Sequence, residues 1–113
     1  MQLEERTVGD IVIVGVKGEI TLNKGSDVVL RDKVRSLIQQ GHLKLIIDLG
    51  QVSYMDSAGL GELVQSYATT TRQGGQLKLL NTTKRIHDLL VITKLSTVFD
   101  LFDDEAVAVS SFT

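Results

Sequence analysis

The sequence predicts an α/β fold: a mostly parallel central sheet with an antiparallel edge hairpin and about four helices. Apolar runs that suit buried strands alternate with amphipathic segments, in the order ββαβαβαβα. Most connections between these strands are long enough to contain a helix, as parallel crossovers require. The hydrophobic fraction is 42% and only 4% of residues are aromatic, so Val, Leu and Ile must build the core.

The first two strands form the predicted hairpin. Residues 2–7 alternate weakly between apolar and polar, which favours an edge strand, and Val8-Gly9-Asp10 supplies a turn. The apolar run over residues 11–16 predicts a buried strand. Residues 18–21 then close this strand and lead into a loop through Gly25.

Ser26 is expected to be the N-cap of the first helix, because serine is a common residue at that position. Gly41 follows this helix at a position where a left-handed residue commonly ends a helix. The apolar positions that share one face of this helix are Leu30, Val34, Leu37 and Ile38.

The middle of the chain predicts a central strand followed by the clearest helix. Residues 45–49 are almost wholly apolar, which is typical of a strand buried on both faces. The helix after it ends near Gly74-Gly75. Its apolar residues recur at intervals of three and four positions: Leu60, Leu63, Val64, Tyr67 and Ala68.

The last third of the chain predicts two more strands and two more helices. Residues 77–80 form a strand, and a third helix follows with Thr82 or Thr83 as its cap. Residues 98–102 are expected to form a short final strand. Asp103 or Asp104 then caps a C-terminal helix that ends near Phe112. No proline, low-complexity tract or internal repeat marks a second domain, so residues 1–113 are expected to form one domain.

Composition argues against several classes of protein. The net charge is −2 and the basic residues are dispersed, which disfavours nucleic-acid binding. The absence of cysteine excludes disulfides and thiolate metal sites. The N-terminal ten residues lack the apolar core of a secretory signal, and no apolar run approaches the roughly 20 residues that span a bilayer. We therefore expect a soluble cytoplasmic protein with no membrane partner.

The segment between the central strand and the second helix is the candidate functional site. Asp56 is expected to cap the helix, which leaves Ser57 at its first position. Such a cap is an ordinary structural feature. Gly59 and Gly61, however, each cost about 1 kcal/mol in a first helical turn relative to Ala. That cost is tolerable where the backbone must approach a neighbouring strand or a partner closely. Met55, Ala58 and Leu60 are expected to give the exposed site an apolar border.

The run Asp56-Ser57-Ala58-Gly59-Leu60-Gly61 closely resembles the phosphorylatable-serine motif of anti-sigma factor antagonists with a STAS domain. The resemblance extends along the chain, through Gly18-Glu19-Ile20, Asp48-Leu49 and Gly74-Gly75 before residues 77–80. It implies a STAS fold and makes Ser57 the phosphoacceptor. Two partners are implied. One is an anti-sigma factor that is also a serine kinase and has the ATPase fold of histidine kinases. The other is a PP2C-type, metal-dependent phosphatase that reverses the modification. No cofactor is implied.

The expected partner surface includes residues from the motif, from the loop after the second strand and from the second helix. The outward positions of that helix, Glu62, Gln65 and Thr69, are natural extensions of the motif, because a standard interface needs about 800 Å² on each side. The predicted contact residues are Thr21, Met55, Asp56, Ser57, Ala58, Gly59, Leu60, Gly61, Glu62 and Gln65.

One position departs from the family pattern. Many members carry Asp where this chain has Thr21, in a loop expected near the serine, and the missing carboxylate changes the electrostatics that a kinase would meet. This departure leaves open a STAS scaffold or regulatory subunit with a non-sigma partner, in a signalling complex or a transport system. The sequence does not fix an oligomeric state.

Three other kinds of site have weaker support. An esterase-type G-x-S-x-G motif is absent because Met55 replaces the first glycine. His42 and His87 are the only histidines, and neither is expected to form a triad with Ser57. Nucleotide-binding patterns are also incomplete, since no G-x-x-x-x-G-K-[ST] run exists. The acidic run 103–105 is explained by helix capping, so we expect neither catalytic nor metal-ligating residues.

Overall fold

The computed structural model describes residues 1–112 and confirms the predicted order of elements. Their bounds are β1 Gln2–Val8, β2 Ile11–Ile20, α1 Ser26–Gln39, β3 Lys44–Met55, α2 Ser57–Arg72, β4 Gln76–Leu80, α3 Lys84–Ile92, the 3-10 helix η1 Leu95–Thr97, β5 Leu101–Phe102 and α4 Glu105–Ser110. The strands lie in the order β1-β2-β3-β4-β5. The β1–β2 pair is antiparallel and every other pair is parallel, as the sequence predicted.

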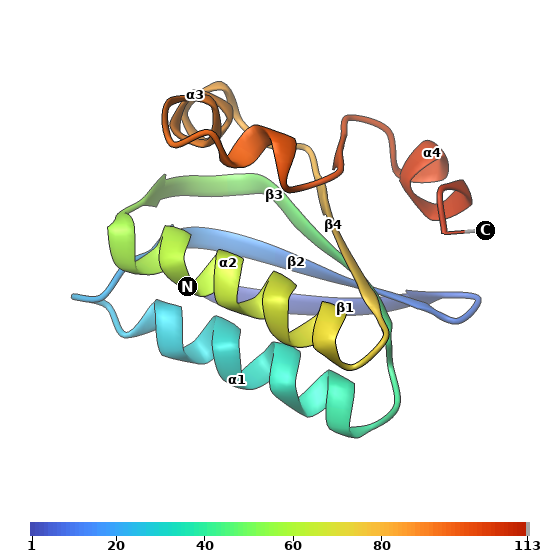
Figure 1. The fold of residues 1–113 in the computed structure, drawn as a ribbon. Coiled ribbons are helices and arrows are strands. Elements are labelled where there is room, and N and C mark those ends of the chain that lie inside the picture. The colour runs from blue at the N-terminus through green and yellow to red at the C-terminus, as the bar shows by residue number, and fades with distance from the viewer. Residues whose placement is uncertain (113) are drawn as a thin grey trace.

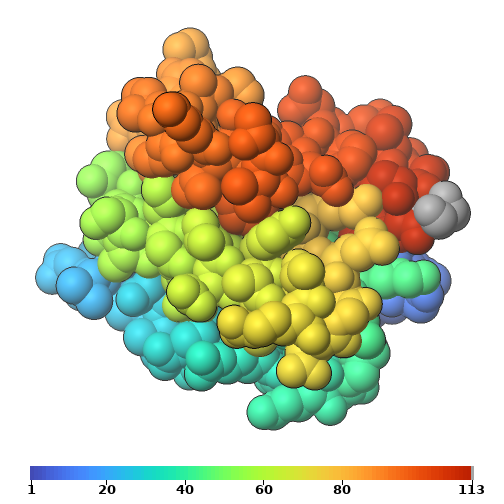
Figure 2. Space-filling view, in the orientation of Figure 1, coloured from blue at the N-terminus to red at the C-terminus, as the bar shows by residue number. Residues whose placement is uncertain are grey.

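The alternation of side chains along the strands divides the core between the two faces of the sheet. Val12 and Val14 of β2 belong to the larger core, which α1 and α2 cover side by side (Figure 1). Ile11 and Ile13 belong to a smaller core on the opposite face, under α4. The space-filling view shows the side chains of α1 and α2 as a continuous layer over the first face (Figure 2).

Several predicted helix boundaries are confirmed by their capping geometry. Asp56 caps α2, the Thr83 hydroxyl accepts from the Ile86 amide at 3.3 Å, and Asp104 caps α4. Gly41, with φ of 89°, follows α1 in the left-handed conformation expected of it. The predicted N-cap of α1 was wrong. Gly25 holds that position with φ of 69° and Ser26 is the first helical residue.

Three strand predictions had the wrong length. β2, predicted over residues 11–16, continues to Ile20. β3 continues past Leu49 to Met55, because residues 51–55 keep pairing with the end of β2 after a shift of register. β5 contains only Leu101 and Phe102, because residues 98 and 99 form a turn after the 3-10 helix and their amides donate to the Leu95 carbonyl oxygen. The longer β3 carries the chain directly into the serine segment.

Candidate functional site

The site is built around the start of α2, at the end of β3. Ser57 is the first residue of the helix and its side chain is exposed. Asp56 precedes it in an extended conformation, and its amide donates to the carbonyl oxygen of Ile20 at 3.3 Å. The serine hydroxyl is therefore presented to solvent from a rigid junction between a central strand and a helix.

The carboxylate of Asp56 ties this junction to the loop after β2. Oδ1 accepts from the Gly59 amide at 2.8 Å and Oδ2 accepts from the Leu22 amide at 3.0 Å. These backbone hydrogen bonds, with that of Gly59 the larger cause, lower the pKa of Asp56 below its ordinary value. Asp56 is thus both the helix cap and the contact that fixes the loop beside Ser57.

The two glycines of the motif differ in how closely the rest of the fold packs around them. A Cβ on Gly59 would lie 2.1 Å from the carbonyl oxygen of Ile20, so the close approach of α2 to β2 requires glycine there. A Cβ on Gly61 would meet nothing within 4 Å, and this residue is exposed. The packing of the fold therefore explains Gly59 and does not explain Gly61.

The loop after β2 lies next to the serine segment, as predicted, but Thr21 itself is buried. Its amide donates to Ser26 Oγ at 2.8 Å, and its hydroxyl accepts from the Lys24 amide at 3.3 Å. Ser26 Oγ in turn donates to the Glu19 carbonyl oxygen at 2.7 Å. These bonds fix the loop internally, and Leu22 is its exposed apolar residue, with 68% of its surface exposed.

The predicted contact residues fall into three groups by exposure. Ser57, Gly61 and Gln65 are exposed, while Asp56, Ala58 and Glu62 are half-buried. The expectation that Met55 and Leu60 border an exposed site was wrong. Both belong to the larger core. The full set of buried contact residues is Thr21, Met55, Gly59 and Leu60. These buried residues shape the site without forming its surface.

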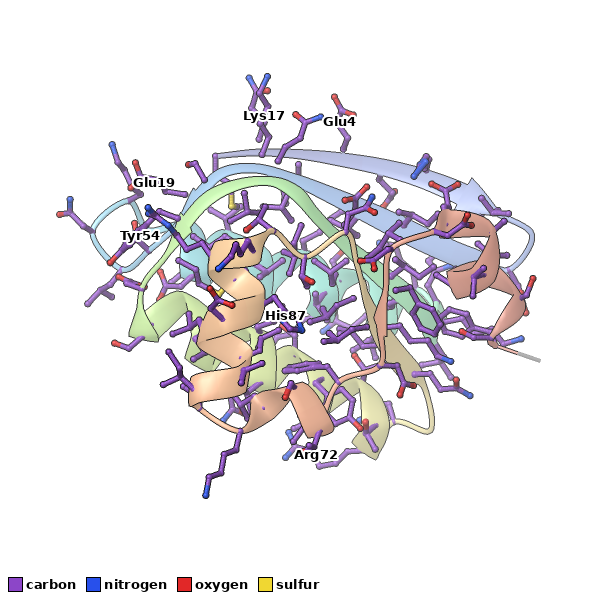
Figure 3. The ribbon with its side chains drawn as sticks, turned by 90° about the horizontal axis from the view of Figure 1, so that it is seen from above. Glu4, Lys17, Glu19, Tyr54, Arg72 and His87 are labelled. Carbon is purple, nitrogen blue, oxygen red and sulfur yellow. The ribbon has the colours of Figure 1, made fainter. Side chains whose placement is uncertain are left out.

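Two exposed apolar side chains near the site were missed. Leu22 stands in the loop that Asp56 fixes, and Tyr54, near the end of β3, is 44% exposed. Tyr54 pairs in register with Glu19 at the end of β2, and both project at this end of the sheet (Figure 3). The Arg85 guanidinium lies 6.0 Å from the centroid of the Tyr54 ring. The one sequence feature that could have predicted this exposed apolar surface was Leu22, an apolar residue in a polar loop.

Glu62 is half-buried and lies near charged residues of α1. Burial raises the pKa of its carboxyl, and the nearby guanidinium groups of Arg31 and Arg35 oppose that rise. Gln65, one turn further along α2, is exposed. Thr69 is half-buried. Of the three positions predicted to extend the surface, Gln65 is the one that solvent reaches freely.

Within residues 1–112, no three His, Asp or Glu side chains gather closely enough to hold a metal ion. His87 is exposed on α3, and His42 is half-buried just after α1. The same residues contain no helix that is both long and apolar enough to cross a bilayer.

Comparison with known proteins decides the family. The sequence matches the STAS domain family over residues 2–108. This chain belongs to the STAS domain family. It is 43% identical over 88 residues to the anti-sigma-B factor antagonist of Bacillus subtilis, an alignment that covers 78% of each chain.

Solved structures show the same fold for this STAS domain. An anti-sigma factor antagonist from Mycobacterium paratuberculosis superposes with a TM-score of 0.84 at 20% identity, over 97% of this chain and 92% of the other. The phosphorylated form of SpoIIAA, a cell fate determinant of Bacillus, gives a TM-score of 0.77 at 20% identity, over 99% and 100% of the two chains. At these identities the likeness establishes the fold.

Proposed function

We propose that this STAS domain is an anti-sigma factor antagonist whose docking is switched off by phosphorylation of Ser57. Its partner is an anti-sigma factor with serine kinase activity and an ATPase fold of the histidine-kinase type. Binding of the unmodified protein to this partner releases the sigma factor. The observation that carries the proposal is the exposed Ser57 hydroxyl at the first position of α2, held beside the fixed carboxylate of Asp56. The names of the relatives support the same function.

Electrostatics explain how one phosphate would act as a switch. An unmodified hydroxyl can be covered by a partner at little cost if it finds one hydrogen bond. A phosphate adds roughly two negative charges beside Asp56. Covering an unpaired charge costs about 3–5 kcal/mol, which weakens binding by roughly 10² to 10³·⁵. A PP2C-type phosphatase restores the docking form.

The modified protein is expected to stay folded. The Ser57 side chain is exposed, so a phosphate has room. The N-terminal end of the sixteen-residue helix α2 also favours negative charge. Phosphorylation therefore removes docking and leaves the fold in place.

The docking surface that this proposal requires is centred on Ser57 and Gly61, with Leu22 and Tyr54 as its exposed apolar contacts. The Asp56 carboxylate holds Leu22 in place by accepting a hydrogen bond from the Leu22 amide. The buried residues of the predicted set act by setting the position of this surface. Thr21 contributes in that way, because it anchors the loop that carries Leu22.

Co-expression with candidate kinases of the histidine-kinase-like ATPase fold tests the proposal, with intact mass and Phos-tag mobility as readouts. Wild type should gain a single phosphate that Ser57→Ala lacks. Ser53→Ala is a matched control, because Ser53 is also exposed four residues earlier. Calorimetry should then show that the same kinase binds the unmodified protein and Ser57→Ala but not the phosphoprotein. Phosphate on another residue, or equal binding of both forms, would refute the switch. No phosphate with any candidate would favour an unphosphorylated scaffold.

A further inference from the structure

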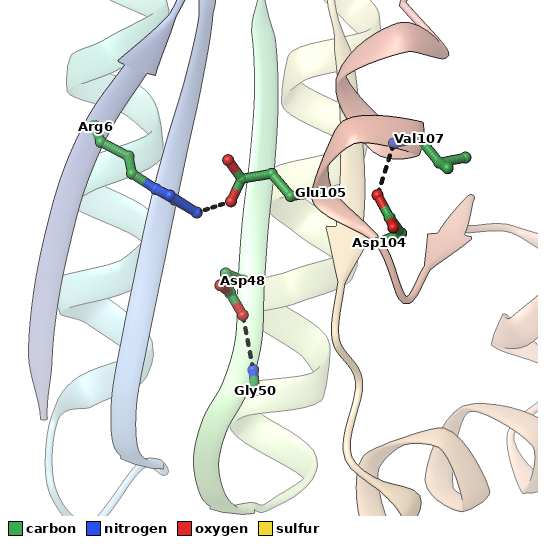
Figure 4. Close-up of polar contacts among 6 residues, drawn as sticks. All are labelled: Arg6, Asp48, Gly50, Asp104, Glu105 and Val107. Carbon is green, nitrogen blue, oxygen red and sulfur yellow. Dashed lines mark hydrogen bonds and ion pairs between the residues drawn. The ribbon is translucent and has the colours of Figure 1, made fainter.

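The first strand, β1, is a long open edge of the sheet. It is the outermost strand at its end of the order, and six of its seven residues are exposed, with Leu3 half-buried. The other edge, β5, has only two residues. In the close-up β1 lies outermost on its side of the sheet (Figure 4). An edge of this kind presents a row of unpaired amide and carbonyl groups that another strand can bind.

The order of charges along β1 is complementary to itself. Charged residues on an edge usually oppose pairing. Here, an antiparallel pair of two β1 strands centred on Glu5 places Glu4 of each copy directly opposite Arg6 of the other. Glu4 and Arg6 are two residues apart and share the face opposite α1, where the Arg6 guanidinium reaches across β2 to Glu105 (Figure 4). In the dimer the exposed Arg6 side chain would turn from Glu105 to Glu4 of the second copy, which replaces one carboxylate partner with another.

Other registers do not share this complementarity. A shift of the centre to Glu4 or to Arg6 places two like charges directly opposite each other on that face. A shift by a single residue would turn the side chains of the second copy to the wrong face of the sheet. The order of charges on this face therefore favours the register centred on Glu5.

The other face of the edge is compatible with the same register. The two Glu5 side chains meet at its centre, and each is already paired, because Glu5 Oε1 lies 3.0 Å from Lys33 Nζ of α1. Val29 lies one helical turn before Lys33 on the same flank of α1 and is 48% exposed. The α1 helices of the two copies would run alongside each other and cover this apolar side chain.

We propose that β1 is a self-association surface, on which a second copy of this chain pairs antiparallel about Glu5 to form one continuous sheet. A single strand pair buries less than a standard interface, so the association is expected to be weak and concentration-dependent. Ser57 stands at the end of β3, with β2 between it and the edge, and remains open in such a dimer. The inference does not depend on the function proposed for Ser57.

Sedimentation equilibrium over about 10 μM to 1 mM tests the proposal, since 1 mM corresponds to about the weakest association worth measuring. Wild type should shift from monomer to dimer across this range. Glu4→Arg and Arg6→Glu should each weaken the dimer by about tenfold, because each places like charges opposite each other twice. An equimolar mixture of these two variants should restore dimers, and so should the double variant Glu4→Arg/Arg6→Glu.

The mixture makes the test independent of folding effects. Arg6→Glu also removes the ion pair with Glu105, but a misfolded variant would not regain association when mixed with Glu4→Arg. Amide exchange within residues 2–8 should slow as the wild-type concentration rises. A monomer at 1 mM, or dimers that the single variants leave unchanged, would overturn the proposal.

Discussion

Gly59 and Gly61 differ in what surrounds them, and this difference gives a matched pair of variants. Gly59→Ala should lower the free energy of unfolding by about 2 kcal/mol or more, because its Cβ would press on the Ile20 carbonyl oxygen. Gly61→Ala should raise it by about 0.5–1 kcal/mol, because Ala is the better helix former and the space is open. Urea denaturation of both variants measures these effects.

The same pair separates folding from docking. If a partner approaches α2 closely, Gly61→Ala should weaken partner binding although it stabilises the fold. Titration of the kinase with wild type and Gly61→Ala measures this. Unchanged binding of the more stable variant would remove Gly61 from the docking surface.

The carboxylate of Asp56 should make stability depend on pH. Its pKa is lowered in the folded protein by hydrogen bonds from the Gly59 and Leu22 amides. Its stabilising effect is therefore fully present above the ordinary pKa of 3.8 and is lost as pH falls through the lower folded value. Asp56→Asn keeps a single oxygen for the two amides and does not titrate.

The melting temperatures of wild type and Asp56→Asn, measured from pH 7 to pH 2, test this coupling. Wild type should be the more stable above about pH 4, and the difference should shrink at lower pH. Asp10, whose pKa is also lowered, chiefly by its hydrogen bond with Lys44, is unchanged in both proteins and does not affect the difference. A gap that stays constant with pH would mean that the carboxylate charge does not act on stability.

The sequence predicted local features of the site better than the exposure of its residues. Asp56 as cap and Ser57 as first helical residue follow from a strand, a carboxylate and a helical period, all within a few residues. The burial of Met55 and Leu60 depends on α2 packing against β2, which a local pattern does not contain. Thr21 was expected to face a partner, but it is buried, and its amide donates a hydrogen bond to Ser26 Oγ.

At the level of elements, the α1–α2 pair changes what a substitution at Glu62 tests. Glu62→Lys would add a third cation facing Arg31 and Arg35, so it should cost about 1 kcal/mol of stability. The exposed Gln65 is the better probe, and Gln65→Lys should change stability by less than about 0.5 kcal/mol. Both should weaken partner binding if the docking surface extends along α2. Thermal denaturation and kinase titration of the two variants provide the comparison, and stable folding with full binding of Gln65→Lys would limit the surface to the first turn.

The bounds of the elements show where sequence patterns fail. Strand β3 was expected to end at Leu49, because the apolar run that predicted it ends there. The strand continues because the end of β2 offers it a partner as far as Met55. Ser26 looked like a cap because its residue type suits one, but Gly25 can adopt the left-handed conformation that the loop needs. Pairing partners and loop geometry, not propensity, decide both cases.

For the whole molecule, the two faces of the sheet are covered unequally. The larger core includes Leu30, Leu63 and Ile47 and fixes α1 and α2, whereas the smaller one has α4 as its helix. The Ser57 site is built entirely on the larger core. Undocking of α4 should therefore leave the geometry of the site unchanged.

Lys78 fastens α4 to the sheet. It is 6% exposed, and its Nζ lies 2.8 Å from Ser111 Oγ and 3.1 Å from the Ser111 carbonyl oxygen. The same ammonium lies 4.6 Å from the centroid of the Phe112 ring. A buried lysine is thus satisfied by the end of the helix that it holds.

Lys78→Ala should release α4 and spare the rest of the molecule. The loss of the stem packing and of the hydrogen bonds should cost about 2 kcal/mol, and Lys84→Ala, whose side chain is 90% exposed, should cost less than about 0.5 kcal/mol. Amide exchange should accelerate in residues 105–110 far more than in α2, because the two helices lie on different cores. Ser57 should then be phosphorylated by its kinase at the wild-type rate. Equal acceleration of exchange in α2 would instead show that both faces of the sheet open as one cooperative unit, and the site would depend on α4 after all.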